Sequence, residues 1–380
     1  MFTVKTLNKI AKVGTDRLDK ALFTIDDNSE APEAIIVRSA KMADYPLNPE
    51  LACIARAGAG YNNIPVDKCA EAGIVVFNTP GANANGVKEL AICALLLASR
   101  KVVAGINWVK SIADQGDEVA ALVEKGKSNY VGPEIMGKTL GLIGLGAVGA
   151  KVAKAANALG MTVVGYDPFL SDALKAELNG IVKLVDEQDA LFAEADYISL
   201  HMPSNDATKN TVRAETIAKM KDGVRIVNIA RGELVNDDDI LAAMASGKVA
   251  AYVTDFPDGK LAAAENVVAI PHLGASTPES EDNCAIMAAD QIAEYLLRGN
   301  IVNSVNLPNL SLEKTGTART VVLAKADTDA AALLKAAGAK VTGSANKTRG
   351  AYLAAILDTD GPADTATLAA VPGVIRVRAI

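Results

Sequence analysis

Residues 138–149 of this chain read KTLGLIGLGAVG, and this stretch decides the fold of the region around it. An apolar run leads into the glycines Gly144, Gly146 and Gly149, and an alanine-rich helical pattern follows at once. A second apolar run then ends at Asp167. This order of strand, glycine turn, helix, strand and acid predicts a dinucleotide site, because backbone amides at the turn and at the helix N-terminus can hold a pyrophosphate.

Each residue of this fingerprint has its own expected role. Gly144 permits the tight turn, Gly146 lets the backbone approach a phosphate, and Gly149 allows close packing of helix and strand. Asp167 is placed to accept hydrogen bonds from ribose hydroxyls, and its charge would repel a 2′-phosphate. No Arg or Lys follows in residues 168–172, so the sequence predicts NAD rather than NADP. A glycine turn that binds nothing is the alternative.

The composition indicates a globular protein of two or three domains. The chain has 380 residues, of which 50% are hydrophobic and 22% are charged. The formal net charge is −7, and no basic run interrupts the acidic balance, so nucleic acid is not expected as a partner.

The cysteine spacing and the length of the apolar runs indicate whether the chain binds metal, where in the cell it lies and whether it crosses a membrane. The four cysteines lack a CxxC spacing, so we expect no metal site and free thiols in a reducing cytosol. The N-terminus resembles the start of a strand rather than a signal peptide, and the longest apolar helical run, residues 90–99, is too short to cross a bilayer. We therefore expect a cytoplasmic protein with no membrane partner.

Strand and helix patterns alternate in two sections, which predicts an α/β protein with parallel sheets. The first section covers residues 1 to about 80 and has no phosphate fingerprint, whereas the second begins at the glycine turn. Long helices are expected over residues 83–101 and 278–297. Between the sections, a polar stretch of residues 111–128 follows the lone Trp108, which we interpret as a packing or interface residue.

The composition becomes rich in Ala and Thr from about residue 310. The pattern there predicts a ferredoxin-like βαββαβ module with no catalytic residue. Its expected elements are a strand at 320–325, a helix at 329–337, strands at 340–345 and 352–357, a helix at 363–370 and a strand at 374–377.

Four strands of the second section end at polar residues, namely His201, Arg231, Asp255 and His272. In an open parallel sheet these ends share one edge, beside the cofactor. The chain has only two histidines, and His272 precedes a loop suited to line a site, so it is the candidate general acid or base. His201 is interpreted as a wall of the nicotinamide site. Arg231 can hold a substrate carboxylate through two parallel N–H bonds, with a solvated surface arginine as the alternative.

Together with the glycine turn, two further motifs carry a family resemblance: NIARGELV at residues 228–235 and PHLGAST at residues 271–277. The chain resembles the D-2-hydroxyacid dehydrogenases from about Ile35 to Leu307, and among them most closely the 3-phosphoglycerate dehydrogenases. The first section adds Arg38-Ser39, GAGYNN at residues 58–63 and NANGVKE at residues 83–89.

The resemblance implies a Rossmann NAD-binding domain at residues 84–277 and a flavodoxin-like, discontinuous substrate domain at residues 1–83 and 278–308. It implies an ACT-like regulatory domain at residues 315–380 and a homodimer or higher homo-oligomer formed through the cofactor domain. By position, the NAD-binding residues are Gly144, Gly146, Ala147, Val148, Gly149, Asp167, His201, Ile229, Ala230, Arg231, Asp255, His272, Gly274 and Ala275. The substrate-binding residues are Arg38, Ser39, Ala59, Gly60, Asn83, Arg231 and His272.

The resemblance also implies a small-molecule substrate, a phosphorylated 2-hydroxy acid. A phosphate requires a local basic patch in an acidic protein, and Arg38, Arg56 and Lys88 are the candidates. The hypothesis is oxidation of 3-phosphoglycerate with NAD, with His272 as base and Arg231 on the carboxylate. Another 2-hydroxyacid dehydrogenase, a glyoxylate or hydroxypyruvate reductase, and an NAD-sensing binding protein on the same fold are the alternatives.

Two departures from the family pattern affect these expectations. The glutamate that usually orients the catalytic histidine is missing from the short stretch TDFPDGK at residues 254–260, and we expect Asp258 to replace it. In the C-terminal module, the loop at residues 325–329 lacks the Asn/Pro/Gly pattern typical of serine binding. An amino-acid effector on this module therefore stays an open expectation. Because every proposed chemical group precedes residue 310, deleting the module is expected to alter assembly or stability rather than chemistry.

Overall fold

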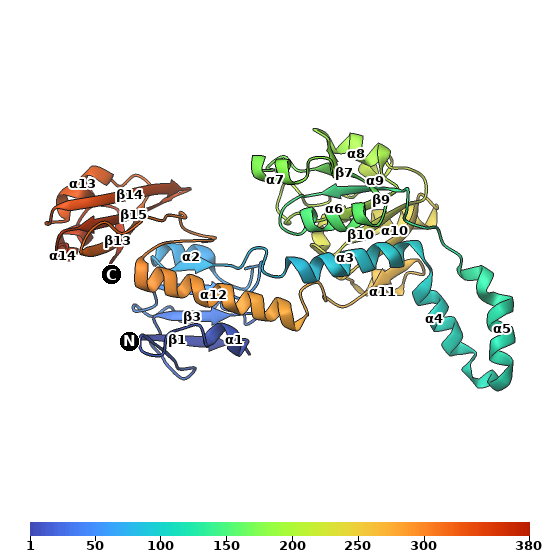
Figure 1. The fold of residues 1–380 in the computed structure, drawn as a ribbon, viewed down its shortest axis with the longest axis horizontal. Helices are drawn as coiled ribbons and strands as arrows, with labels where there is room; N and C mark the ends of the chain where they lie inside the picture. Colours follow the sequence, from blue (N-terminus) through green and yellow to red (C-terminus); the bar gives the residue numbers. More distant parts are fainter. The chain divides into compact units, whose positions relative to one another are not determined.

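A computed structural model describes residues 1–380 of the chain, which divide into two compact units (Figure 1). Unit 1 consists of residues 1–83 and 278–380, and unit 2 consists of residues 84–277. No helix is both long enough and apolar enough to cross a membrane.

The first part of unit 1 is a five-stranded parallel sheet in the order β2-β1-β3-β4-β5. This strand order confirms the expected flavodoxin-like fold. The strands are β1 (Phe2–Leu7), β2 (Phe23–Ile25), β3 (Ala34–Val37), β4 (Cys53–Arg56) and β5 (Val75–Phe77), and the helices are α1 (Lys12–Thr15), α2 (Val66–Glu71) and α12 (Pro278–Arg298).

Both faces of this sheet are buried, because alternate residues of each strand point to opposite sides. On β3, Ala34 and Ile36 join the cluster that contains α12, whereas Ile35 and Val37 join the cluster beneath α2. Helix α1 packs closely on α12: a Cβ on Gly14 would lie 2.6 Å from the Cβ of Ala285.

The C-terminal module is a four-stranded antiparallel sheet in the order β14-β15-β13-β16, which confirms the ferredoxin-like arrangement. One face carries Val322, Leu353 and Leu357 and is covered by α13 and α14. The opposite face carries Val321 and Ile356, which belong to the same core cluster as α12. The elements are β13 (Ala318–Lys325), α13 (Ala330–Ala336), β14 (Val341–Arg349), β15 (Tyr352–Thr359), α14 (Thr365–Ala369) and β16 (Val374–Ala379).

Arginines fix this module to the rest of unit 1. Arg378 donates to the backbone carbonyls of Tyr295 and Leu296 at 2.9 and 2.6 Å, at the C-terminal end of α12. Arg319 is buried, pairs with Asp358 at 2.6 Å, and donates to the Arg298 carbonyl at 2.9 Å. These bonds connect the module to carbonyls in the last turn of α12, where a helix leaves carbonyls without intrahelical partners.

Unit 2 is a seven-stranded parallel sheet in the order β12-β11-β10-β9-β6-β7-β8, the strand order of a Rossmann fold with one added edge strand. The strands are β6 (Thr139–Ile143), β7 (Thr162–Tyr166), β8 (Val182–Leu184), β9 (Tyr197–Leu200), β10 (Val224–Asn228), β11 (Val249–Thr254) and β12 (Val267–Ala269). The helices are α3 (Ala84–Ser99), α4 (Val102–Ser111), α5 (Val119–Gly126), α6 (Gly149–Ala158), α7 (Asp172–Glu177), α8 (Gln188–Glu194), α9 (Ala214–Ile217), α10 (Asp237–Ala245) and α11 (Gly259–Ala263), with short 3₁₀ turns at Ala113–Glu118, Lys127–Tyr130 and Gly232–Leu234.

Helices cover both faces of the seven-stranded sheet. Leu140 and Leu142 of β6 join the cluster with α3 and α6, whereas Ile143 joins the cluster with α8 and α10. Gly141 of β6 lies where a side chain would collide with Leu191 of α8, its Cβ falling 2.5 Å from the Leu191 Cδ2. The sheet therefore holds the glycine turn after β6 between two packed layers.

Helices α4 and α5 extend away from the sheet of unit 2 (Figure 1), and neither has a buried residue. The polar stretch 111–128 thus contains the 3₁₀ turn Ala113–Glu118 and all of α5, elements that the sequence pattern had not predicted. Trp108 stacks on Tyr130 with ring centroids 5.1 Å apart, so it packs within this arm as expected.

Candidate active site

The glycine turn after β6 has the geometry that a pyrophosphate requires. Gly144 has a φ of 91°, and a Cβ there would lie 2.7 Å from the carbonyl oxygen of His201. At Gly149 a Cβ would lie 2.0 Å from the Gly144 carbonyl oxygen, so only glycine permits this approach. A Cβ on Gly146 meets nothing within 4 Å, which leaves open space above the backbone. Helix α6 begins here with no side-chain cap on its N-terminal amides.

The Asp167 carboxylate is oriented by this same turn. Its Oδ2 accepts a hydrogen bond from the Leu145 amide at 2.9 Å, and its Oδ1 accepts one from the Phe169 amide at 2.9 Å. Each oxygen retains a further acceptor position, which is where ribose hydroxyls would donate. Ala147 is exposed and Val148 is partly exposed beside the open space above Gly146.

His201 lies directly against the glycine turn, since its amide donates to the Ile143 carbonyl at 2.8 Å. Its Nε2 is 2.8 Å from the Ser199 hydroxyl. Desolvation lowers the pKa of His201 to about 4, so its ring is neutral at physiological pH. A neutral imidazole supports the interpretation of His201 as a wall rather than a proton carrier.

The turn after β10 presents Arg231. Asn228 is buried and holds this turn: its Nδ2 donates to the Arg231 carbonyl at 2.8 Å, and its Oδ1 accepts from the amides of Ala230 and Arg231 at 3.2 and 3.3 Å. The Arg231 Nη1 donates to the Ala230 carbonyl at 2.6 Å, which leaves the other guanidinium donors available to a ligand. Ile229 is buried beneath this turn.

Phe256 joins the Arg231 turn to the His272 loop. A Cβ on Gly232 would lie 3.4 Å from the Phe256 Cβ, and the Phe256 ring is 4.5 Å from the His272 ring at an angle of 51°. His272 itself is exposed. Phe256 was not among the predicted site residues, although its place directly after Asp255 at a strand end was a usable signal.

Asp255 and Asp258 have different surroundings. Asp255 is buried, and its Oδ2 accepts from the Gly274 amide at 3.2 Å, whereas its Oδ1 has no hydrogen-bond partner. Burial raises the pKa of Asp255, and the Gly274 amide and the charge of His272 oppose that rise. Asp258 is exposed and caps α11, with its Oδ1 accepting from the Leu261 amide at 2.8 Å. The expected position of Asp258 beside His272 is therefore not what the structure shows: its carboxylate caps α11, whereas the carboxylate that interacts electrostatically with His272 is that of Asp255.

Unit 1 gathers its candidate residues at the carboxyl edge of the five-stranded sheet. The loops there are tied together: the Thr79 amide donates to the Gly58 carbonyl at 3.1 Å, and the Asn78 side chain donates to the Ala59 carbonyl at 2.7 Å. The Ser39 amide donates to the Asn8 side chain at 3.0 Å. Gly60 and Asn83 are partly exposed at this edge.

Two arginines lie at this edge of unit 1. Arg38 pairs with Glu281 of α12 at 2.7 Å. The Arg56 guanidinium packs against the backbone of Gly58: a Cβ on Gly58 would lie only 1.1 Å from the Arg56 Nη1. Both arginines lower the pKa of Cys284, which burial raises, so both charges lie near the same thiol. Glu281 as the partner of Arg38 is a contact that sequence reasoning missed, because α12 and β3 are far apart in the chain.

The described groups fit a bound NAD on several independent observations. The turn is open above Gly146, Asp167 is held by two amides, and the buried Asp255 Oδ1 is an acceptor without a donor. A nicotinamide carboxamide is the kind of donor that would satisfy such an acceptor.

Comparisons with known proteins agree with this geometry. The family model described as "D-isomer specific 2-hydroxyacid dehydrogenase, NAD binding domain" matches residues 93–274. A hydroxypyruvate reductase of Thermotoga maritima is 41% identical over 276 residues, which cover 70% of this chain and 85% of that protein. A D-3-phosphoglycerate dehydrogenase of Methanocaldococcus jannaschii is 37% identical over 284 residues, which cover 72% of this chain and 51% of that protein. The chain spans about half the length of such phosphoglycerate dehydrogenase relatives.

Solved structures show the same similarity. The NAD⁺-bound 3-phosphoglycerate dehydrogenase of Entamoeba histolytica has a TM-score of 0.62 and 28% identity, covering 81% of this chain and 99% of that chain. A glyoxylate reductase of Paecilomyes thermophila has a TM-score of 0.67 and 25% identity, covering 80% of this chain and 98% of that chain. The chain belongs to the D-isomer-specific 2-hydroxyacid dehydrogenase family. It is an NAD-dependent oxidoreductase that acts on a small molecule, and the region that matches the NAD-binding domain model lies within unit 2.

Proposed function

We propose that this dehydrogenase oxidises D-3-phosphoglycerate to 3-phosphohydroxypyruvate with NAD, which is the first step of serine synthesis. The observation that carries the proposal is the pair Arg38 and Arg56 at the carboxyl edge of unit 1, where two guanidiniums lie near one thiol. Arginine forks suit phosphate oxygens, and a protein with net charge −7 needs such a local patch to bind a dianion. Several relatives bear this activity in their names.

In the proposed reaction, each residue has one task. Arg231 holds the substrate carboxylate, so that C2 is fixed in orientation. His272 accepts the proton of the C2 hydroxyl on an imidazole nitrogen as the carbonyl forms. Bound NAD supplies the acceptor for the hydride that leaves C2. The neutral His201 forms a wall of the site and takes no proton.

We further propose that Asp255 stabilises the positive charge that develops on His272. Its carboxylate interacts electrostatically with His272, whereas the Asp258 carboxylate is used as a helix cap. A carboxylate beside an imidazole favours the imidazolium. Asp255 would thus accept a hydrogen bond from the carboxamide of the cofactor and also stabilise the positive charge on His272.

The proposal extends to the roles of the domains and to the assembly of the chain. We propose that residues 1–83 and 278–308 bind the substrate, that residues 315–380 have a regulatory role, and that the chain forms a homodimer through unit 2. The arm supports this assembly: Val102, Ile106 and Val109 of α4 are 47%, 48% and 40% exposed. They recur at the spacing of one helix face, and an exposed apolar face of this kind marks a protein interface.

The test of the proposed activity compares substrates that differ only in phosphate. Rates of NADH formation would be measured with D-3-phosphoglycerate and D-glycerate, and rates of NADH consumption with 3-phosphohydroxypyruvate and hydroxypyruvate. Two charge-assisted contacts, each of about 1.5–3 kcal/mol, predict a kcat/KM preference for the phosphorylated partner of at least about 100-fold. Equal or greater kcat/KM for hydroxypyruvate would favour the activity named for the Thermotoga relative instead.

A variant of Arg56 tests whether the two arginines cause the preference for the phosphorylated substrate. Arg56→Gln should reduce the preference for phosphate about tenfold or more while leaving the rate with the unphosphorylated substrate nearly constant. The matched control is Arg17→Gln, because Arg17 is an exposed arginine of the same unit that pairs with Asp290 at 2.5 Å. If Arg56→Gln lowers both rates equally, Arg56 does not read the phosphate.

A further inference from the structure

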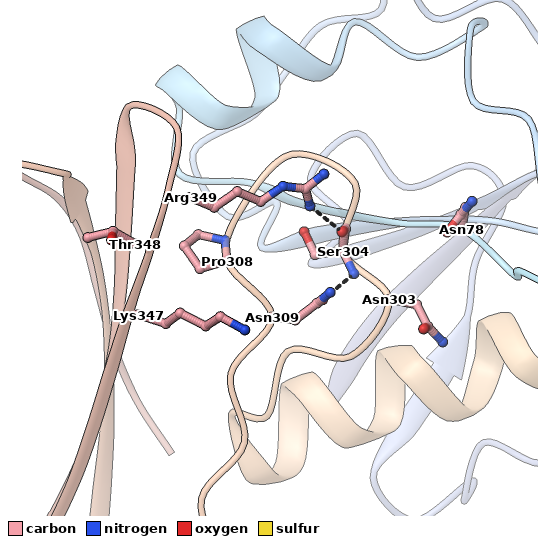
Figure 2. Close-up of a pocket in the computed structure, with 8 residues that line it drawn as sticks. All are labelled: Asn78, Asn303, Ser304, Pro308, Asn309, Lys347, Thr348 and Arg349. Carbon is pink, nitrogen blue, oxygen red and sulfur yellow. Dashed lines mark hydrogen bonds between the residues drawn. The ribbon is translucent and has the colours of Figure 1, made fainter. Parts of the chain in front are cut away.

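A polar pocket of about 410 Å³ lies in unit 1 where the C-terminal module meets the loop after α12 (Figure 2). Its walls come from three segments that are far apart in the chain: the end of β5, the loop at residues 303–309, and the end of β14. The lining residues are Asn78, Asn303, Ser304, Pro308, Asn309, Lys347, Thr348 and Arg349. The size is within the range of pockets that hold small ligands.

The charge of this pocket is one-sided. Two of its lining residues, Lys347 and Arg349, are cations, and none is an Asp or Glu. The whole chain has a net charge of −7, so an uncompensated pair of cations in a recess stands out against its surroundings. Such a recess attracts small anions and repels cations.

The strand geometry explains why the two cations share the pocket. Side chains on β14 alternate between faces, so Ala345, Lys347 and Arg349 point to the same side. Ala345 packs against the core cluster that contains α12, and the same face becomes basic where β14 continues beyond that cluster. In Figure 2 the Lys347 and Arg349 side chains extend from β14 toward the loop that carries Ser304 and Asn309.

Hydrogen-bond donors remain for a ligand. The Arg349 Nη1 donates to the Ser304 carbonyl at 2.8 Å, which holds the guanidinium in place while its other donors stay available. Asn309 accepts from the Ser304 amide through Oδ1 at 2.7 Å, so its NH₂ group is left to donate. Lys347 forms no salt bridge, so its ammonium group is also left for a ligand. Asn303, in the loop that forms one wall, has a backbone φ of 60°.

We propose that this pocket binds a small oxyanion, a phosphate- or carboxylate-bearing molecule, held by Lys347, Arg349 and the Asn309 amide. The site is separate from the proposed active site and does not depend on which 2-hydroxy acid is oxidised. A ligand there would connect the C-terminal module to Asn78, whose side chain donates to the Ala59 carbonyl at 2.7 Å in a loop of the candidate substrate edge. The pocket is therefore placed to relay an anionic signal from the module to that loop.

The test is calorimetric titration of the full-length protein with inorganic phosphate and, separately, with succinate, at constant ionic strength set by NaCl. Whichever ion binds wild type more tightly identifies the preferred oxyanion. Lys347→Gln should weaken that binding about five- to tenfold or more, and the control Lys335→Gln, an exposed lysine on α13 outside the pocket, should not change it.

A second variant replaces one neutral donor of the pocket with a negative charge. Asn309→Asp retains the acceptor for the Ser304 amide but replaces the NH₂ donor with a negative charge, so binding should be lost. Its control is Asn346→Asp, which adds the same charge to an exposed position of β14 that does not line the pocket. Thermal melts of both variants establish that each is folded.

Binding at the candidate active site is distinguished with Arg38→Gln. If anion binding survives Arg38→Gln, is weakened at least about fivefold by Lys347→Gln and is lost in Asn309→Asp, the proposal holds, whatever the substrate test shows. Anion binding that is lost in Arg38→Gln and unchanged in the two pocket variants would overturn it. Absence of binding by wild type to either ion, or equal heats with added NaCl, would overturn it as well.

Discussion

Asp255 is a buried carboxylate of the candidate site whose hydrogen-bonding capacity is only partly used. It is 1% exposed, one of its oxygens accepts from Gly274, and the other has no partner in the protein. An unpaired buried charge costs stability, so it persists where function requires it. Asp167 differs, because both of its oxygens already accept from backbone amides. The role expected for it from the sequence is recognition of the ribose.

Replacing Asp255 with Asn should make the protein without cofactor more stable and the enzyme slower. Burial raises the pKa of Asp255, so the folded chain binds this proton more tightly than the unfolded chain does. The cost to stability is therefore present above the folded pKa and disappears as pH falls through it. We expect the melting temperature of Asp255→Asn to exceed that of wild type by about 2–4 °C at pH 8, with a smaller difference at pH 4.

The same variant should lower kcat by roughly 10- to 1000-fold, which is the range of acid–base assistance. Asp258→Asn is the matched control, because Asn also caps a helix well, and we expect its rate and melting temperature to stay near those of wild type. A large rate loss in Asp258→Asn with none in Asp255→Asn would return the role to Asp258.

Asp167→Ser should weaken NAD binding by about tenfold or more and narrow the preference for NAD over NADP. It removes a charged acceptor for the ribose and the charge that repels a 2′-phosphate. Binding of both cofactors would be measured by fluorescence titration. Asp172→Ser, at a fully exposed aspartate on α7, is the control. Equal use of NAD and NADP by the wild-type protein would contradict the role given to Asp167.

At the scale of elements, the arm of α4 and α5 extends away from the sheet of unit 2 (Figure 1). Neither helix buries a residue, and the stacked pair Trp108 and Tyr130 is the contact that closes the arm on itself. An apolar helix face that is left exposed in this way is a liability in a monomer. An interface with a second chain would remove the liability.

Ile106→Asp should convert the proposed dimer to monomer, because it places a charge in the middle of the apolar face of α4. Sedimentation equilibrium would measure the mass over a range of concentrations. Asn107→Asp adds the same charge at an exposed position on the other side of α4 and should leave the dimer intact. A wild-type protein that sediments as a monomer at all concentrations would exclude the assembly.

For the whole molecule, the C-terminal module is part of the core of unit 1 as well as a module of its own. Val321, Leu323 and Ile356 lie in the same buried cluster as Tyr295 and Leu296 of α12. Arg376 adds bonds to the carbonyls of Leu51 and Pro49. Removal of the module would uncover apolar surface and carbonyls together.

Truncation after residue 310 should therefore lower stability while leaving the chemical groups in place. We expect the truncated chain to melt at least about 5 °C below the full chain and to bind a hydrophobic dye, and its kcat at 20 °C to remain measurable. Arg378→Gln, which loses the two bonds to the end of α12, should show a smaller decrease in melting temperature. A truncated chain as stable as the full one would show that the shared cluster contributes little.

The sequence by itself determined the local units of this protein. The glycine turn, Asp167 and the strand ends at Arg231 and His272 depend on neighbours within a few residues, so their patterns could be read directly. The βαββαβ order of the C-terminal module was predicted for the same reason. The strand orders of the parallel sheet in unit 1 and the antiparallel sheet of the module then agreed with the expected fold classes.

Only the tertiary structure decided the contacts between segments that are distant in the chain. Asp258 follows a short loop and was expected beside His272, yet local capping of α11 uses its carboxylate. The Glu281 partner of Arg38, the Phe256 ring against His272 and the basic pocket at the end of β14 all arise from packing that no short pattern encodes. The physical reason is that a periodic pattern shows which face of an element is buried, whereas the partner on that face is set by the assembly of the whole sheet.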